Sequence, residues 1–238
     1  MSKKYREIEY CGFDWYVIDE DNESYTLLLK EKLQPTVIKD LFKDKYLDTD
    51  FDVGFNLDDS NWRWKDSIIR QVLNQKFLDK YLDKNNLIKM KTTVFFDNEK
   101  STAKDYARLL TKEELENLDY NIRKVGSKYG YWTMSPYYLF SPNASASVWS
   151  VNSLGKLYAN CTTEARGVRP VIKLKADYKK QATLDLSSAI ALKNLTETII
   201  GFLSDIDSLI MKRKYAEANH SISKVRKMLK DFVKTLDL

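Results

Sequence analysis

The sequence predicts an α+β protein with a helical C-terminal extension. Between about Glu9 and Lys175, strand-like segments come first, helix-like segments follow, and strand-like segments return. From Leu184 onward the chain has no proline and a single glycine, and its apolar residues follow a heptad-like spacing. We therefore expect two parts, an α+β domain over residues 1–180 and an α-helical hairpin over residues 184–238.

Composition limits the classes of partner. The chain has 238 residues, of which 43% are hydrophobic, so it can build a sizeable core. Its formal net charge of +5 arises from 39 Lys and Arg residues and 34 Asp and Glu residues. This balance predicts a mixed surface. Because no run of five consecutive basic residues occurs, we expect no nucleic acid partner.

The sequence also indicates the cellular compartment in which the protein is made. No run of about 18 apolar residues occurs, so we expect no membrane span. The charged start of the chain is not followed by an apolar segment, which predicts no signal peptide and synthesis in the cytoplasm. The two cysteines, Cys11 and Cys161, imply no disulfide framework and fit a reducing compartment.

Residues 13–30 predict a β-hairpin. Aromatic and β-branched segments flank a turn rich in Asp and Asn, as hairpin turns require. The acidic turn itself, Asp19–Glu23, lacks the ligand spacing and the glycine of a calcium loop, so it is interpreted as a solvated turn.

Two helices are expected in the middle of the domain. A start signal at residues 58–60 precedes apolar residues at helical spacing up to Phe77, and Trp62 and Trp64 at its entrance are interpreted as core anchors. A second helix begins at Thr111, because Thr111 and Glu114 have the spacing of a capping box.

After Gly126 the chain returns to strands and turns. Between Trp132 and Tyr158 the only charged residue is Lys156, in a protein of which 31% is charged. Solvated loops usually carry charge, so this composition favours a surface that contacts something; an ordinary set of tight turns and short strands is the alternative. Trp132 itself is predicted to lie in the core.

The C-terminal part contains two apolar series with alternating spacings of three and four residues. The second series does not continue the register of the first, so we expect a break near residues 211–214 and an antiparallel hairpin; one bent helix is the alternative. Two narrow seams bury little area, which predicts an assembly or docking role. The assembly residues are expected to be Leu195, Ile199, Phe202, Ile206, Ile222, Val225, Leu229 and Phe232.

Catalytic and metal sites are not expected, and neither is a cofactor. The chain has one histidine, His220, no paired cysteines and no cluster of glycines. Cys161 is followed by two arginines that could activate its thiol, but a buried inert thiol is the favoured interpretation. Arg169, before Pro170, is predicted to be a partly buried, hydrogen-bonded structural residue. Glu164 and Arg166 could join it in an ion network.

Five short blocks carry a resemblance to a family of unknown function in bacterial and phage proteins, covering about residues 9–175. The first block joins residues 15–18 (WYVI) and 27–30 (LLLK), and the others are residues 64–74 (WKDSIIRQVLN) with Phe77, 109–114 (LLTKEE), 131–136 (YWTMSP) and 167–174 (GVRPVIKL). The family is related to C-type-lectin-like folds, including sulfatase-modifying enzymes. The resemblance implies a C-type-lectin-like domain whose first strand, around Trp15, lies near its last strand, Val171–Leu174.

The chain also departs from the family pattern. It has Val72 where members often have Trp, and Thr133–Met134 where they often have Leu–Arg. The Glu–Pro–Asn and Gln–Pro–Asp triplets of calcium-dependent lectins are absent. Formylglycine-generating relatives use cysteines near the end of the fold, where this chain has only Cys161, with Cys11 far away in sequence. That activity is therefore not carried over.

The resemblance implies a non-enzymatic binding or display module. In lectin-like domains the segment before the final strand forms an exposed face, and a Trp among Ser and Asn resembles an antibody paratope. The expected ligand-binding residues are Asn143, Ser145, Ser147, Trp149, Asn152, Tyr158, Asn160 and Thr162.

Phage members of the family suggest a virion component, such as a baseplate or tail receptor-binding protein that contacts a host-surface ligand, with the helical tail binding a protein partner or a second copy. An intracellular bacterial or prophage accessory protein that binds one partner is the first alternative. A sulfatase-modifying type of enzyme is the second.

Overall fold

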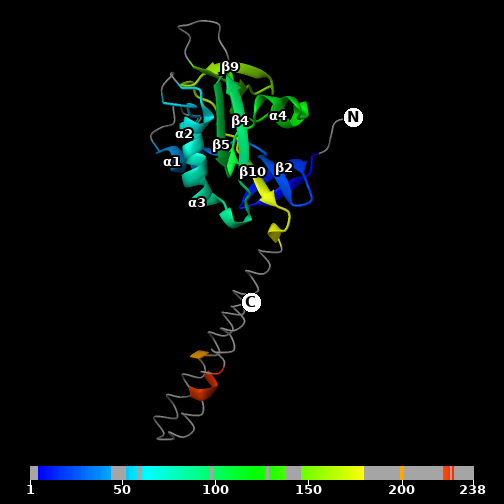
Figure 1. The fold of residues 1–238 in the computed structure, drawn as a ribbon, viewed down its shortest axis with the longest axis vertical. Coiled ribbons are helices and arrows are strands. Elements are labelled where there is room, and N and C mark those ends of the chain that lie inside the picture. The colour runs from blue at the N-terminus through cyan, green and yellow to red at the C-terminus, as the bar shows by residue number, and fades with distance from the viewer. Residues whose placement is uncertain are drawn as a thin grey trace. The chain divides into compact units, whose positions relative to one another are not determined.

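A computed structural model describes residues 5–43, 52–57, 61–96, 99–126, 129–137 and 146–179, together with 199–200, 222–225 and 227. The chain divides into two compact units, Met1–Tyr178 and Lys179–Leu238. The first unit combines short helices with antiparallel sheets, which confirms the predicted mixed α and β class (Figure 1). Within the described part of the chain, no helix has the length and apolarity needed to cross a membrane.

The centre of the first unit is a five-stranded sheet in the order β1-β2-β3-β10-β6. All its neighbouring strands are antiparallel. The bounds are β1 Glu7–Tyr10, β2 Phe13–Glu20, β3 Ser24–Leu29, β6 Ala107–Arg108 and β10 Val171–Lys175. The predicted hairpin over residues 13–30 is confirmed as β2 and β3. The last strand shares this sheet with the Trp15 strand, but β3 lies between them: Leu29 is opposite Trp15, and Leu28 is opposite both Tyr16 and Val171.

The turn of this hairpin is held by Asp21. Its Oδ1 accepts hydrogen bonds from the Glu23 amide at 2.9 Å and the Ser24 hydroxyl at 2.8 Å. Together with Lys173, these donors lower the pKa of Asp21 to about 2. The acidic turn is thus a structural feature of the hairpin.

Both faces of the five-stranded sheet are covered by apolar side chains. Leu27 and Leu29 of β3 face one cluster, together with Ile172 of β10, while Leu28 and Val171 face the other. This follows from the alternation of side chains along a strand. The first cluster includes residues of α1 to α3 and the second includes residues of α4 and α5. The bounds are α1 Pro35–Phe42, α2 Ile68–Val72, α3 Leu78–Tyr81, α4 Lys112–Glu116 and α5 Tyr120–Arg123.

The helix expected after residues 58–60 starts later than predicted. The start signal lies outside the described residues. Trp64–Asp66 form a 3₁₀ turn, and α2 begins after Ser67, whose hydroxyl accepts a hydrogen bond from the Arg70 amide. A π-helical turn over Leu73–Phe77 then leads into α3. Trp62 and Trp64 are buried, as predicted.

The helix at Thr111 is confirmed as α4, with both hydrogen bonds of the capping box present. Arg169 is fully buried, which exceeds the predicted partial burial. It donates hydrogen bonds to the carbonyl oxygens of Leu29, Lys30 and Ile122 and to the Tyr131 hydroxyl. The guanidinium therefore ties β3 to α5 and β7. It is not part of the ion pair between Glu164 and Arg166, whose atoms lie 2.8 Å apart.

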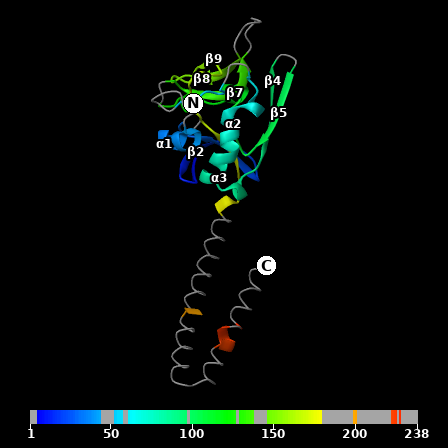
Figure 2. The ribbon, with the colours of Figure 1, turned by 90° about the vertical axis from the view of Figure 1, so that its left-hand side faces the viewer.

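Two further sheets complete the unit. One contains β7 Tyr131–Tyr137, β8 Ser147–Val151 and β9 Leu157–Cys161, and the other is a ribbon of β4 Met90–Phe96 and β5 Glu99–Asp105. Figure 2 shows the β4–β5 ribbon along one side of this unit. The predicted core position of Trp132 is confirmed, because its side chain is fully buried and donates a 2.8 Å hydrogen bond to the Val53 carbonyl.

Little of the predicted C-terminal hairpin can be described. Five of its expected assembly residues, Leu195, Phe202, Ile206, Leu229 and Phe232, lie outside the described residues. Residues 199–200 and 222–225 are helical. The side chains of Ile199, Ile222 and Val225 are partly buried, whereas 61% of Ile200 is exposed. The hairpin stays a prediction.

Candidate functional site

The structure separates the residues that the sequence predicted as one ligand-binding set. Asn143 and Ser145 lie outside the described residues. Ser147 and Thr162 are buried, Trp149 is half-buried, and Tyr158 is 55% exposed. Because side chains alternate along β8, Trp149 projects from the sheet on the side opposite to Ser150. The remaining predicted residues, Asn152, Tyr158 and Asn160, lie together.

These three residues help to line a hollow of about 200 Å³, called here the Tyr158 hollow. Its lining residues are Tyr129, Ser150, Asn152, Tyr158, Asn160 and Arg166. They come from β8, β9, the turn between these strands, and the segments just before β7 and β10. The sequence interpretation missed Tyr129, Ser150 and Arg166. Only the cross-strand pairing of Ser150 with Tyr158 could have identified Ser150.

A hydrogen-bonded network connects three lining residues of the Tyr158 hollow, Ser150, Asn160 and Arg166, through Glu164. The Ser150 hydroxyl donates to Oδ1 of Asn160, and Nδ2 of Asn160 donates to Oε2 of Glu164 at 2.8 Å. The same carboxylate oxygen accepts from Arg166 at 2.8 Å. These bonds occupy both ends of the Asn160 amide and hold it in one orientation. Asn160 therefore contributes to the shape of the hollow.

Asn152 also has a structural task. Its Oδ1 accepts hydrogen bonds from the amides of Leu154 and Lys156 and so closes the turn between β8 and β9. Gly155 has a φ of 81° in this turn, a conformation that favours glycine. The small polar residues that suggested a contact surface are thus partly explained by turn formation. Tyr158 is the lining residue with a large exposed apolar surface.

Trp149 lines a different cavity, of about 670 Å³, on the other side of the sheet. Its ring lies edge-on to Tyr137 with the centroids 4.7 Å apart, and Nζ of Lys112 lies 5.1 Å from its ring centroid. Phe95 of β4 also lines this cavity. The predicted aromatic anchor is therefore packed against β7 and α4, away from Tyr158.

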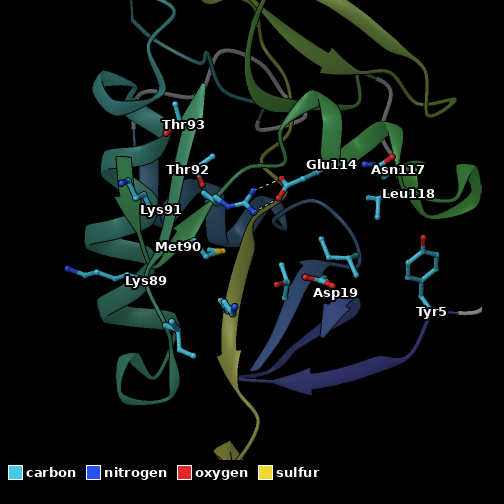
Figure 3. A pocket seen from close by; sticks show the side chains of 15 residues that line it. Tyr5, Asp19, Lys89, Met90, Lys91, Thr92, Thr93, Glu114, Asn117 and Leu118 are labelled. Atoms are coloured by element: carbon cyan, nitrogen blue, oxygen red, sulfur yellow. Dashed lines mark hydrogen bonds and ion pairs between the residues drawn. The ribbon is translucent and has the colours of Figure 1, made fainter. Parts of the chain in front are cut away.

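A third cavity, of about 740 Å³, is formed by residues far apart in sequence (Figure 3). Arg108 forms a two-point ion pair with Glu114, whose carboxylate also accepts from the Thr111 amide. The Arg108 Nε atom is buried and has no hydrogen-bond partner among the described residues. The capping-box pattern identified Glu114 as a cap, but its pairing with Arg108 depends on how β6 meets α4.

The cysteines do not form a disulfide. Cys161 is partly exposed, so the interpretation of a buried thiol is wrong. Its Sγ lies 3.3 Å from the Thr163 hydroxyl, whereas Arg166 pairs with Glu164 and Arg169 points into the core. Among the described residues, no group of three or more His, Cys, Asp or Glu side chains could hold a metal ion.

No protein-family model, no curated protein and no solved structure matches the chain.

Proposed function

We propose that this protein is a non-enzymatic binding module whose Tyr158 hollow accepts one sugar ring of a host-surface carbohydrate. The exposed ring of Tyr158, in a hollow that is also lined by hydrogen-bonded polar side chains, is the observation that carries this proposal. An aromatic face provides an apolar platform for the C–H face of a sugar, and its hydroxyl offers a polar contact. A few polar groups around such a platform then fix the orientation of the ligand.

The charges around the Tyr158 hollow favour binding over acid–base chemistry. Arg166 is the charged residue among those that line it, and it is paired with the neighbouring Glu164. A general acid or base must be free to exchange a proton with its substrate. The carboxylate of Glu164 instead pairs with Arg166 and accepts a hydrogen bond from Asn160, and these contacts hold the side chains in fixed positions. A rigid frame lowers the entropy cost of binding.

Saturation-transfer NMR on the full chain with a panel of soluble mono- and disaccharides tests this proposal. We expect at least one saccharide to bind the parent protein, and Tyr158→Ala to weaken that binding about tenfold, or about 1.4 kcal/mol. Leu154→Ala is a matched control, because Leu154 is 58% exposed in the adjacent turn and does not line the hollow. If no saccharide binds the parent, or if Tyr158→Ala binds as the parent does, the proposal fails.

We further propose that the first unit is a C-type-lectin-like domain of a phage or prophage virion protein, in a baseplate or tail. This part rests on the sequence resemblance alone. Mass spectrometry of purified particles induced from the source bacterium tests it. Absence of the protein from the particles, together with its retention in cells, would favour the intracellular accessory protein instead.

The C-terminal unit is proposed to be the assembly element. Ile222 and Val225 are partly buried and have the three-residue spacing of one helix face. In the full chain, Ile222→Asp with Val225→Asp should abolish self-association or partner binding in sedimentation velocity. The exposed Lys224 supplies a control, Lys224→Asp, that changes charge on the same turn. Unchanged sedimentation of the double variant would overturn this role.

A further inference from the structure

The β4–β5 ribbon has two faces of very different character. Its inner face contains Val94, Ser101, Ala103 and Asp105, which are buried. Its outer face pairs Lys91 with Lys104, Thr93 with Thr102, and Phe95 with Lys100 across the two strands. Lys89, one step before β4, adds a further lysine, with its Nζ 5.0 Å from the centroid of the Tyr106 ring. We define the basic face as these outer residues together with Tyr106: Lys89, Lys91, Thr93, Phe95, Lys100, Thr102, Lys104 and Tyr106.

Four lysines and no acidic residue make up the charges of the basic face. Lys91 and Lys104 are directly opposite each other, and like charges in that position destabilise a strand pair. Lys91, Lys100 and Lys104 form no ion pair with any residue in the described part of the chain. The basic face therefore presents an unneutralised positive charge.

Some other lysines of the unit differ in this respect. Lys30 pairs with Glu7, Lys80 with Asp40 and Lys173 with Asp21, at distances of 2.7, 2.6 and 3.2 Å. Lys89 and Lys91 line the same cavity as Glu114 (Figure 3), but the Glu114 carboxylate is already bound to Arg108. These three lysines thus have a carboxylate partner, whereas the lysines of the basic face have none among the described residues.

Two aromatic rings accompany these lysines. Phe95 is 68% exposed and lies opposite Lys100. Tyr106, at the other end of the face, is contacted by both Lys84 and Lys89. The exposed Phe95 ring leaves apolar surface in water, which is unfavourable, whereas Tyr106 is partly buried against the core. Rings interleaved with cations are typical of surfaces that bind single-stranded nucleic acids, where the bases stack and the phosphates are neutralised.

We propose that the basic face binds single-stranded nucleic acid. Lysines two residues apart on one strand are about 7 Å apart along the ribbon, a step comparable with that between phosphates of an extended single strand. Lys91 and Lys104 contact the phosphates, and Phe95 stacks on a base. A duplex offers its phosphates but not the faces of its bases, and an acidic polypeptide has no base to stack, so the combination favours a single strand. The inference is independent of the Tyr158 hollow.

The expectation of no nucleic acid partner rested on the absence of consecutive basic residues. In the ribbon the lysines alternate with inward-facing residues on two strands, so no run appears in the sequence. Pairing of the strands brings the lysines onto one face, so the cluster of positive charge exists only in the folded ribbon.

Fluorescence anisotropy of the full chain with a labelled oligothymidylate, measured over a range of salt concentrations, tests the proposal. The logarithm of the binding constant should fall linearly with the logarithm of salt concentration, with a slope of about −0.7 per phosphate neutralised. Lys91→Gln with Lys104→Gln should make that slope shallower by about 1.4 and weaken binding about tenfold. Phe95→Ala should weaken binding about fivefold or more without changing the slope.

Lys39→Gln with Lys65→Gln is the matched control, because both lysines are exposed on other elements of the unit. The control variant should bind as the parent does. Three results would overturn the proposal: no difference between the two double-lysine variants, tighter binding of a duplex of the same length, or competition by polyglutamate together with an unaffected Phe95→Ala variant.

Discussion

The centre of the five-stranded sheet and the β4–β5 ribbon are both antiparallel, yet they differ in how their faces are covered. In the centre, β3 and β10 are covered on both faces, and all their leucine, isoleucine and valine side chains pack into one of the two apolar clusters. The ribbon is covered on one face only, and its other face carries four lysines. A strand with a free face can carry residues that do not stabilise the fold. The comparison therefore separates the part that holds the protein together from the parts available for binding.

Arg169 shows that a polar group buried in the centre has hydrogen-bond partners. Its guanidinium is fully buried, but its donors reach three carbonyl oxygens and one hydroxyl. A buried charge is tolerated when its hydrogen bonds are satisfied. The lysines of the ribbon have no such partners among the described residues, and they lie where water can solvate them.

The largest change in stability is expected when the packing beside the centre is disrupted. Trp132→Ala should lower the free energy of unfolding by about 3–5 kcal/mol, because it leaves a cavity and removes the hydrogen bond to Val53. Urea denaturation monitored by circular dichroism measures this change. Phe95→Ala, which removes an exposed ring, should change stability by about 0.5 kcal/mol or less. Equal effects of the two substitutions would contradict the comparison.

A smaller loss is expected when the polar tie of the centre is removed. Arg169→Met should cost about 3 kcal/mol, since it leaves several buried carbonyl oxygens without donors. Arg166→Met is a suitable control, because it removes a pair with the partly exposed Glu164 and should cost about 1 kcal/mol or less. An Arg169→Met protein as stable as the control would show that the carbonyl oxygens find other donors.

The smallest effect has the opposite sign and lies in the ribbon. Lys104→Glu converts a like-charge pair with Lys91 into an attractive one, so it should raise the free energy of unfolding by about 0.5 kcal/mol. The same substitution should abolish binding of the oligothymidylate. Lys65→Glu introduces the same charge change elsewhere and should give neither gain nor loss of binding. A destabilised Lys104→Glu protein would indicate that Lys104 has a stabilising contact.

Local patterns predicted several elements correctly. The hairpin over residues 13–30, the Thr111 capping box, the buried Trp132 and the hydrogen-bonded Arg169 all follow from neighbours close in sequence or from residue type. The late start of α2 did not follow, because Ser67 supplied a cap within the apolar series.

The predicted binding face shows where such reasoning ends. Trp149 and Tyr158 are close in sequence and similar in chemistry, but strand alternation and the pairing of β8 with β9 place them in separate cavities.

By itself, the sequence determined the mixed α and β class, the hairpin and the residue types of the core, because hydrophobic periodicity and capping act over a few residues. Tertiary structure decided which polar side chains share a surface. The Tyr158 hollow depends on the approach of Tyr129 and Arg166 to β8 and β9, and the basic face depends on the register between β4 and β5. Side chains alternate between the two faces of a strand, so a shift of one residue in that register would place Lys104 on the inner face and Ala103 on the outer face.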